Sequence, residues 1–357
     1  MQALPPGSTI GILGGGQLAR MLALAAARLG LKCRIFAPEH DSPAFQVCAS
    51  HIVARYDDQN ALLEFAAEVD AITYEFENVP VAAVEFLEKL KPVRPGSKAL
   101  AVSQDRIKEK SLARDLGALT AEFRAVNSMD ELRTAAKDVG LPAILKTTRM
   151  GYDGKGQARI SNPDDLAHAF AAMHGQSAIL ESFVRFEKEI SVICARGADG
   201  QFVAYDVPEN LHRNHILHTS TVPAQIDKML STEAVFVASR MAEALDYVGV
   251  MAVELFVGED VIYVNEIAPR VHNSGHWTMD ACVVSQFEQH MRCVAGWPLG
   301  STLRHSDVVM TNLLGDESNA WATLAALPQV GLHLYGKAEA RPARKMGHFN
   351  KISPRQA

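Results

Sequence analysis

The sequence predicts a mixed α/β and α+β protein: an N-terminal Rossmann-like domain with a parallel sheet, a larger α+β region and a small C-terminal domain. The first hundred residues alternate strand and helix patterns, which is typical of a parallel sheet covered by helices. The middle region contains closely spaced apolar runs that suit antiparallel strands. With 48% hydrophobic and 21% charged residues, the 357-residue chain has a globular composition but is too long for one compact core.

The N-terminal domain is predicted over residues 1–100. Its strands are expected at 9–13, 33–36 and 71–74, where short β-rich apolar runs occur. Apolar residues at helical spacing from Leu18 to Leu29 predict a helix that Gly30 ends, and a second helix is expected over 81–90. The breaker-rich segment 91–96 marks the boundary to the next domain.

The middle domain is predicted over residues 101–296 and the C-terminal domain over 297–357. A charged helix is expected at about 105–116, and the predicted strands are 142–146, 178–180, 190–195, 202–207, 252–257 and 261–265.

Composition excludes several classes of protein. The formal net charge of −6, from 35 basic and 41 acidic residues, argues against nucleic-acid binding. Five cysteines without a CxxC spacing argue against a disulfide framework or a zinc site, so we expect a cytoplasmic protein. The sequence shows neither a signal-peptide pattern nor an apolar run long enough for a membrane span, so no membrane association is expected.

A glycine-rich loop follows the first predicted strand. Gly14-Gly15-Gly16-Gln17-Leu18-Ala19 fits G-x-G-x-x-[GA], and Glu39 follows the second strand, which together indicate a dinucleotide fold. The same loop could be only a tight strand-to-helix turn, or a helix N-terminus that meets another polar ligand.

A second glycine-rich segment follows a lysine at the end of a predicted strand. Lys146 precedes Gly151-Tyr152-Asp153-Gly154-Lys155-Gly156-Gln157, whose backbone N–H groups could close over phosphates while the lysine supplies charge. The segment is not a Walker motif, because no Gly-Lys-[Ser/Thr] opens a helix. A flexible hairpin tip and a solvated lysine are the alternatives.

Two glutamates are predicted to face each other across a hairpin. If the turn centres near Asp260, Glu254 lies opposite Glu266, with Asn265 adjacent. Two like charges so placed are destabilising unless a cation lies between them, and carboxylate oxygens suit Mg²⁺. A register slip that leaves one glutamate in solvent is the alternative.

The polar loop 268–277 follows this hairpin directly. Arg270 offers a planar fork for a carboxylate or phosphate, and His272 could donate or transfer a proton. We expect His276, beside Trp277, to make a structural hydrogen bond.

Basic residues gather near the C-terminus at Lys337, Arg341, Arg344 and Lys345. In a net-acidic protein such a cluster could bind a phosphate monoester. A solvated basic surface is the alternative.

Together these segments resemble the ATP-grasp superfamily, and specifically the N5-carboxyaminoimidazole ribonucleotide synthetase family. The resemblance covers nearly the whole chain and rests on the segments 14–20, YEFENVP at 74–80, KTTRMGYDGKGQ at 146–157, ESFVRFEKEIS at 181–191, NEIAPRVHNSGHWT at 265–278 and the basic segment 337–348. It implies an ATP-grasp fold with a flap region at about 120–185.

The resemblance also implies roles for matching positions. The residues implied for ATP are Arg106, Lys146, the flap Gly151, Tyr152, Asp153, Gly154, Lys155, Gly156 and Gln157, the hinge Glu181, Ser182, Phe183 and Val184, then Glu189, His212, Asn265 and Glu266. Those implied for the ribonucleotide are Gln17, Leu18, Glu75, Asp153, Asn273, Lys337, Arg344 and Lys345. Glu254 and Glu266 would bind Mg²⁺, with Mn²⁺ as a substitute, and Arg270, His272 and Lys146 would be catalytic.

The activity implied is ATP-dependent carboxylation of aminoimidazole ribonucleotide by bicarbonate, through carboxyphosphate, in a homodimeric enzyme. A formate-dependent glycinamide ribonucleotide transformylase would share the fold. An NAD-dependent dehydrogenase would use the first glycine loop but leave the glutamate pair and the basic cluster unexplained. The presence of Lys146, Glu254, Glu266 and Arg270 argues against a non-catalytic nucleotide-binding regulator.

Overall fold

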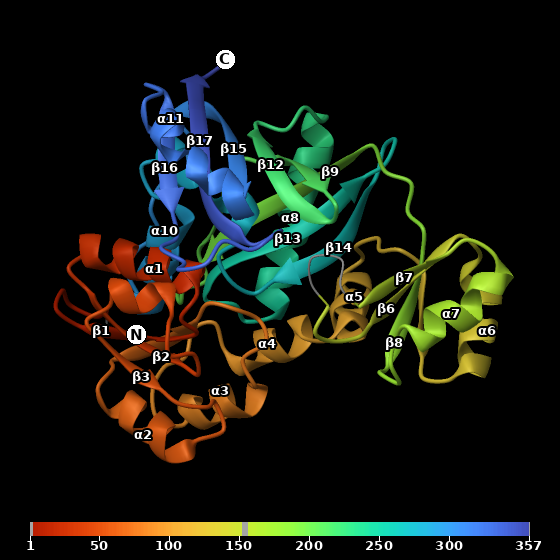
Figure 1. The fold of residues 1–357 in the computed structure, drawn as a ribbon, viewed down its shortest axis with the longest axis horizontal. Helices are drawn as coiled ribbons and strands as arrows, with labels where there is room; N and C mark the ends of the chain where they lie inside the picture. The colour runs from red at the N-terminus through yellow and green to blue at the C-terminus, as the bar shows by residue number, and fades with distance from the viewer. Residues whose placement is uncertain (1–2, 152–155, 357) are drawn as a thin grey trace.

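The computed structural model describes residues 3–151 and 156–356, and their strands form three sheets. Figure 1 shows the N-terminal sheet below the central sheet and a small sheet projecting to one side. Within the described residues, no helix is both long enough and apolar enough to cross a membrane.

The N-terminal sheet has the order β3-β2-β1-β4, and all of its pairs are parallel, as predicted. Its strands are β1 (Thr9–Leu13), β2 (Lys32–Ala37), β3 (Ser50–Val53) and β4 (Ala71–Tyr74). The helices of this region are α1 (Gln17–Arg28), α2 (Gln59–Ala67), α3 (Val81–Glu88) and α4 (Ser97–Ser103).

The small sheet is antiparallel, with the order β5-β8-β6-β7. Its strands are β5 (Phe123–Val126), β6 (Ala143–Thr147), β7 (Gln157–Ile160) and β8 (Ala178–Ser182). Two helices, α6 (Met129–Val139) and α7 (Leu166–Ala171), cover it around a separate apolar core (Figure 1). The predicted strands at 142–146 and 178–180 correspond to β6 and β8, whereas β5 and β7 were not predicted.

The central sheet runs β14-β13-β9-β11-β12-β15-β17-β16, and β10 pairs with β9. Its first strands are β9 (Lys188–Arg196), β10 (Phe202–Ala204), β11 (Glu209–Arg213), β12 (Ile216–Val222), β13 (Gly249–Val257) and β14 (Ile262–Ala268). The predicted strand 202–207 is thus shorter than expected, and the β11–β12 hairpin was not predicted.

The C-terminal segment continues this sheet through β15 (Ser306–Leu314), β16 (Val330–Leu334) and β17 (Lys345–Pro354). Because β15 pairs with β12, the basic segment before β17 is carried back toward the middle of the molecule. The remaining helices are α5 (Arg106–Asp115), α8 (Lys228–Ala244), α9 (Thr278–Ala281), α10 (Gln286–Ala295) and α11 (Trp321–Ala325).

Helix α10 joins the N-terminal sheet to the central sheet within one continuous core. Its His290 is fully buried, accepts a hydrogen bond from the Val250 N–H at 3.0 Å through Nδ1, and lies 2.8 Å from Thr73 Oγ1 through Nε2. Since Nδ1 is an acceptor, the proton of the neutral ring is on Nε2 and is donated to Thr73. Burial lowers the pKa of His290 to about 4.

This pKa predicts an acid sensitivity of folding. Between pH ~6.5 and about 4, this histidine is protonated in the unfolded chain but not in the folded chain. The unfolding free energy therefore keeps its full value above pH ~6.5 and decreases as the pH falls from there toward 4. The loss of unfolding free energy can reach roughly 3 kcal/mol. We expect thermal unfolding of His290→Gln to depend less on pH between 7 and 5 than wild type. The exposed His305→Gln is the control, and equal acid sensitivity in all three proteins would contradict the account.

Candidate functional site

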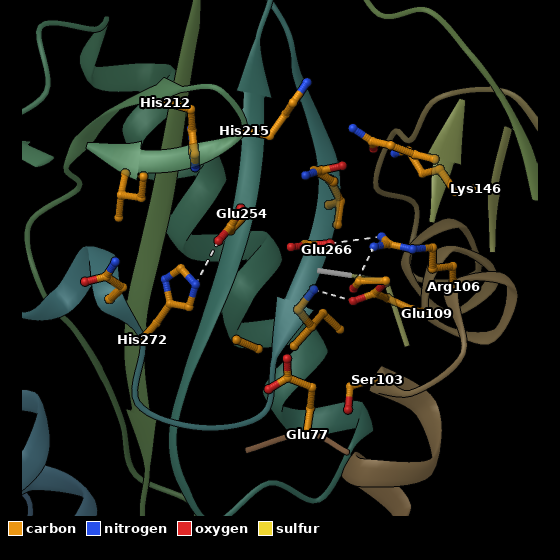
Figure 2. Close-up of a pocket in the computed structure, with 18 of the residues that line it drawn as sticks. Glu77, Ser103, Arg106, Glu109, Lys146, His212, His215, Glu254, Glu266 and His272 are labelled. Atoms are coloured by element: carbon orange, nitrogen blue, oxygen red, sulfur yellow. Dashed lines mark hydrogen bonds and ion pairs between the residues drawn. The ribbon is translucent and has the colours of Figure 1, made fainter. Parts of the chain in front are cut away.

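A cleft of about 970 Å³ lies where the three sheets meet. Its walls come from the end of β4, from α5, from β6 and β8, and from the β13–β14 pair with the loop after it. Figure 2 shows Glu254, Glu266, Arg106, Lys146 and His272 around this space, although they come from segments far apart in the sequence.

The N-terminal glycine loop holds a carboxylate of the protein itself. Glu75, at the end of β4, accepts hydrogen bonds from the N–H groups of Gly16 at 2.7 Å and Ala19 at 3.1 Å. A Cβ at Gly14 would lie 2.4 Å from Glu75 Cγ, and one at Gly16 would lie 2.5 Å from Glu75 Oε1. The glycines therefore serve the close approach of Glu75, and its carboxylate occupies the helix N-terminus where a dinucleotide pyrophosphate would bind.

The β13–β14 register confirms the predicted glutamate pair. Glu254 lies opposite Glu266, and a bulge immediately after this pair leaves Asn265 without a partner on β13. Both carboxylates already have partners: His272 Nε2 lies 2.9 Å from Glu254 Oε1, and Arg106 Nη1 lies 2.9 Å from Glu266 Oε2 (Figure 2). Arg106 therefore supplies a compensating charge from one side and His272 a hydrogen-bond partner from the other, and the expected cation between the two carboxylates stays a prediction.

The pKa of Glu254 reflects this arrangement. Burial raises the pKa, but the side chains of His272, His212 and Arg270 together outweigh burial and lower it to about 2. Glu254 is therefore a carboxylate at neutral pH, and its side chain lines the cleft.

A buried group of charges supports the opposite wall. Glu181 on β8 lies 2.8 Å from Lys146 Nζ and 3.4 Å from Lys110 Nζ. Burial raises the pKa of Glu181, but the two lysines bring it to about 2. Lys110 also donates to the Asn265 carbonyl at 3.1 Å and so holds the β14 bulge.

Glu109 belongs to the same group. Its carboxylate accepts from the Ile267 N–H, and burial, followed by the charge of Glu266, raises its pKa to about 8. Sequence reasoning missed both Glu109 and Lys110 because they lie in a helix of strongly charged composition that looked solvated. The available signal was the i,i+3 spacing of Arg106 and Glu109, which puts them on one helix face.

Arg270 is fixed by a residue that sequence reasoning also missed. Its Nε donates to Glu77, and its Nη1 donates to the Val271 carbonyl at 3.1 Å. Burial raises the pKa of Glu77, but the adjacent guanidinium lowers it to about 2. Glu77 lies in the YEFENVP segment, so the segment was recognised but not the role of this residue in orienting Arg270.

Most of the predicted residues do meet in the cleft. Those that line it are Gln17, Leu18, Glu75, Arg106, Lys146, Gly151, Gln157, Glu181, Ser182, Phe183, Val184, Glu189, His212, Glu254, Asn265, Glu266, Arg270, His272, Asn273 and Lys345. The predicted Gly156, Lys337 and Arg344 are not among the lining residues. Tyr152, Asp153, Gly154 and Lys155 lie outside the described residues.

The β11–β12 hairpin forms a further wall of the cleft; the resemblance implied His212 for ATP, but the hairpin itself was not predicted. His212 Nδ1 lies 2.8 Å from Glu189 Oε2, and Asn214 and His215 form the turn with positive φ values of 51° and 63°. The aromatic rings of Phe186 and Phe256 also line the cleft and stack with their centroids 4.5 Å apart. They give the cleft a flat apolar surface.

The basic segment meets the cleft through Lys345. The Lys337 ammonium donates to the Lys345 carbonyl at 2.6 Å, and burial lowers the pKa of Lys337 to about 8. Arg344 donates to the Glu339 carbonyl at 2.8 Å, whereas Arg341 pairs with the exposed Glu339 side chain at 2.7 Å. The predicted cluster thus divides into a part beside the cleft and the solvent-exposed Arg341.

Two residues of the loop after β14 behave differently. His276 is buried and contacts Gln286 Nε2 at 3.0 Å through Nδ1, as expected for a structural histidine. In contrast, both polar side-chain atoms of Asn273 are buried and find no partner among the described residues. A buried amide with both ends unpaired is costly unless a ligand or water satisfies it.

Models of three protein families match successive parts of the chain. They are the ribonucleotide synthetase preATP-grasp domain over residues 7–104, the ATP-grasp domain over 111–287 and the phosphoribosylaminoimidazole carboxylase C-terminal domain over 308–357.

Whole-chain relatives agree with these matches. The N5-carboxyaminoimidazole ribonucleotide synthase of Brucella melitensis is 51% identical over 99% of this chain and 98% of its own length. The crystal structure of the ADP complex of an N5-carboxyaminoimidazole ribonucleotide synthetase has a TM-score of 0.95 at 44% identity, covering 99% of this chain and 94% of that one. The Aspergillus clavatus enzyme in complex with ADP and 5-aminoimidazole ribonucleotide has a TM-score of 0.91 at 30% identity, covering 98% and 94%.

The glycine loop yields a structural prediction. In Gly16→Ala, the new methyl would meet Glu75 Oε1, and since Gly16 has an ordinary φ of −74°, only this contact opposes the change. We expect a loss of about 1–3 kcal/mol in unfolding free energy and a displaced Glu75 carboxylate. Gly258→Ala is the control, because its new methyl would lie 3.1 Å from Val261 Cγ1 and at ordinary contact distance from Tyr263 and the Val261 carbonyl. A crystal structure of Gly16→Ala with Glu75 unmoved would contradict this reason for the glycine.

Proposed function

The chain belongs to the N5-carboxyaminoimidazole ribonucleotide synthase family of ATP-grasp ligases, and on that premise we propose how its cleft binds two substrates and joins them. It is an ATP-dependent ligase of purine biosynthesis that carboxylates 5-aminoimidazole ribonucleotide. The observation that carries the proposal is that one cleft contains the Glu254–Glu266 pair, two lysines paired with Glu181, and the unpaired Asn273. The carboxyl source proposed is bicarbonate.

ATP is proposed to lie between the small sheet and the β13–β14 pair. The backbone of Glu181, Ser182, Phe183 and Val184 would read the adenine, next to the stacked Phe186 and Phe256. Glu189, held by His212, would accept hydrogen bonds from the ribose. Arg106 and Lys146 would contact the phosphates, and residues 151–157 would close over them.

Mg²⁺ is proposed at Glu254 and Glu266, with Asn265 adjacent and Mn²⁺ as a substitute. Hard oxygen ligands on facing strands fit this ion. Among the described residues there is no group of three or more His, Cys, Asp or Glu that could hold a metal. The ion proposed is held by two carboxylates together with phosphate oxygens and water. Such an ion would neutralise charge on the transferring phosphoryl group.

The ribonucleotide is proposed on the opposite side of the cleft. The Asn273 amide would form hydrogen bonds with the base or the ribose, and Glu75, Gln17 and Leu18 would line the same pocket. Lys345, with Lys337 and Arg344 beside it, would hold the 5′-phosphate. Asp153, which lies outside the described residues, is proposed to reach this substrate from the flap.

The proposed chemistry has two steps. A bicarbonate oxygen attacks the γ-phosphorus, the bond to the β-phosphate oxygen breaks, and ADP and carboxyphosphate form. The amine of the ribonucleotide then bonds to the carboxyl carbon, directly or after CO₂ is released, and inorganic phosphate leaves. Arg270, oriented by Glu77, would hold bicarbonate and carboxyphosphate, with His272 nearby as a hydrogen-bond donor.

A homodimer in the cytosol is proposed, and the five free cysteines suit that compartment.

The direct test measures ADP release by the purified chain with ATP, Mg²⁺, bicarbonate and 5-aminoimidazole ribonucleotide, omitting each in turn. We expect full turnover only in the complete mixture. Turnover with formate and glycinamide ribonucleotide instead would contradict the proposal.

The metal assignment predicts the behaviour of Glu266→Gln. The neutral amide is a poorer Mg²⁺ ligand, so kcat should fall at least about tenfold and the Mg²⁺ concentration for half-maximal rate should rise. Glu259→Gln at the exposed hairpin turn is the matched control. Unchanged Mg²⁺ dependence in Glu266→Gln would count against the assignment.

The phosphate assignment predicts a contrast between two neighbouring arginines. Arg344→Ala should raise KM for the ribonucleotide by about 10–100-fold, since a charge-assisted hydrogen bond contributes ~1.5–3 kcal/mol, and should leave KM for ATP nearly unchanged. Arg341→Ala, which removes an exposed arginine paired with Glu339, should change neither constant. A larger effect on ATP than on the ribonucleotide would place the phosphate elsewhere.

A further inference from the structure

A chain of polar side chains runs through the central sheet to His272. Its members are Ser220 on β12, Asn210 on β11, Ser191 on β9 and Ser274 in the turn Asn273–Gly275. Ser220, Ser191 and Ser274 are fully buried, and Asn210 is 7% exposed. Burying this many polar groups is unfavourable unless each has a partner, so the hydrogen bonds between them define their arrangement.

The direction of the hydrogen bonds can be fixed from the histidine. The Ser274 N–H points at His272 Nδ1 at 3.3 Å, and a backbone N–H can only donate. Nδ1 is therefore an acceptor, so the Ser274 hydroxyl at 2.8 Å must also donate to it. Ser274 then accepts from the Ser191 hydroxyl at 2.7 Å.

The far end of the chain agrees with this direction. Ser191 accepts from the Asn210 amide at 3.0 Å, and Asn210 accepts from the Ser220 hydroxyl at 2.7 Å. Every proton in the chain thus points toward His272. Because Nδ1 receives these bonds, the proton of the neutral ring must be on Nε2, which lies 2.9 Å from Glu254 Oε1.

The backbone of His272 is held separately. The Gln286 side chain accepts from the His272 N–H at 2.9 Å and donates to the His272 carbonyl at 2.7 Å. The position of the residue thus depends on Gln286, while the hydroxyl chain acts on the ring. A substitution in the chain can therefore change the ring without displacing the loop.

We propose that the Ser274 hydroxyl, at 2.8 Å the closer of the two donors to Nδ1 and supported by Ser191 and Asn210, makes Ser274 a positioning residue that sets the tautomer of His272 and so directs an Nε2–H donor at Glu254. With the opposite tautomer, a ring lone pair would face the Glu254 carboxylate, and repulsion would turn the carboxylate away from Glu266. The hydrogen bond to Glu254 is the kind of outer contact that orients a metal-binding carboxylate. This inference rests on the proposed role of Glu254, but the tautomer can be measured without activity.

The first experiment records long-range ¹H–¹⁵N NMR spectra of ¹⁵N-histidine-labelled protein at about pH 8.5, where a free imidazole is neutral. The spectrum of His272→Gln identifies the His272 signals. We expect the wild type to show only the Nε2–H tautomer, and Ser274→Ala to show a mixture of both. A pure Nε2–H tautomer in Ser274→Ala would overturn the proposal.

The second experiment compares steady-state kinetics of the same variants. Ser274→Ala should lower kcat by about 10–100-fold, as for other contacts behind a metal ligand, while KM for ATP and for the ribonucleotide changes little. Ser285→Ala removes the hydroxyl of a 9% exposed serine that caps α10 and lies outside the hydrogen-bonded series of side chains, so it should keep wild-type kcat and tautomer. An equal loss of kcat in Ser285→Ala would show that destabilisation alone is responsible and would overturn the proposal.

Ser191→Ala provides a second variant should Ser274→Ala not fold. The Ser274 hydroxyl then loses the donor behind it, so the tautomer should shift in the same direction but less. A pure Nε2–H tautomer with wild-type kcat in Ser191→Ala would count against the chain as the cause. Failure of the proposed function would appear differently, as wild-type protein without ribonucleotide-dependent ADP release but with an unchanged tautomer spectrum.

Discussion

Two carboxylates, Glu254 and Glu266, face each other across β13 and β14, and the rest of the site is organised around their mutual repulsion. Directly opposed side chains lie ~5 Å apart at Cβ, so an uncompensated pair would weaken the strand pairing. Compensation comes from two directions: Arg106 arrives on α5, and His272 arrives from the loop after β14. The site therefore forms only when the central sheet, α5 and this loop are packed together.

The same constraint extends into the layers behind the pair. Lys110 and Glu109 lie on α5 with Arg106 and bond to the backbone of β14, so the helix that brings the compensating charge also fixes the bulge beside Glu266. Glu109 has a pKa of about 8 because it is buried close to another carboxylate, and it adds little negative charge at neutral pH. The negative charge of this part of the site lies on Glu181 instead, which pairs with Lys110 and Lys146.

The parts of the structure that the sequence predicted are those determined by local patterns. Apolar β-rich runs and a short turn predicted the β13–β14 hairpin and the pairing of Glu254 with Glu266, but not the bulge that shifts the register by one residue between this pair and the turn. Repeated strand–helix patterns predicted the parallel N-terminal sheet. Contacts between distant segments were not predicted: Glu77 with Arg270, Glu109 with Ile267, and β15 with β12 depend on packing that no local pattern encodes. The first glycine loop shows the limit most clearly, because its motif fits a dinucleotide site while its glycines accommodate Glu75.

The central claim is that this pair of carboxylates converges on a divalent cation shared with the nucleotide. The most direct measurement is a crystal structure with Mn²⁺ and a non-hydrolysable ATP analogue, using the anomalous signal of manganese to locate the ion. We expect an anomalous peak within coordination distance of both the Glu254 and Glu266 carboxylates and of the analogue's phosphate oxygens. A peak away from both glutamates, or a bound nucleotide with no ion at this pair, would contradict the account.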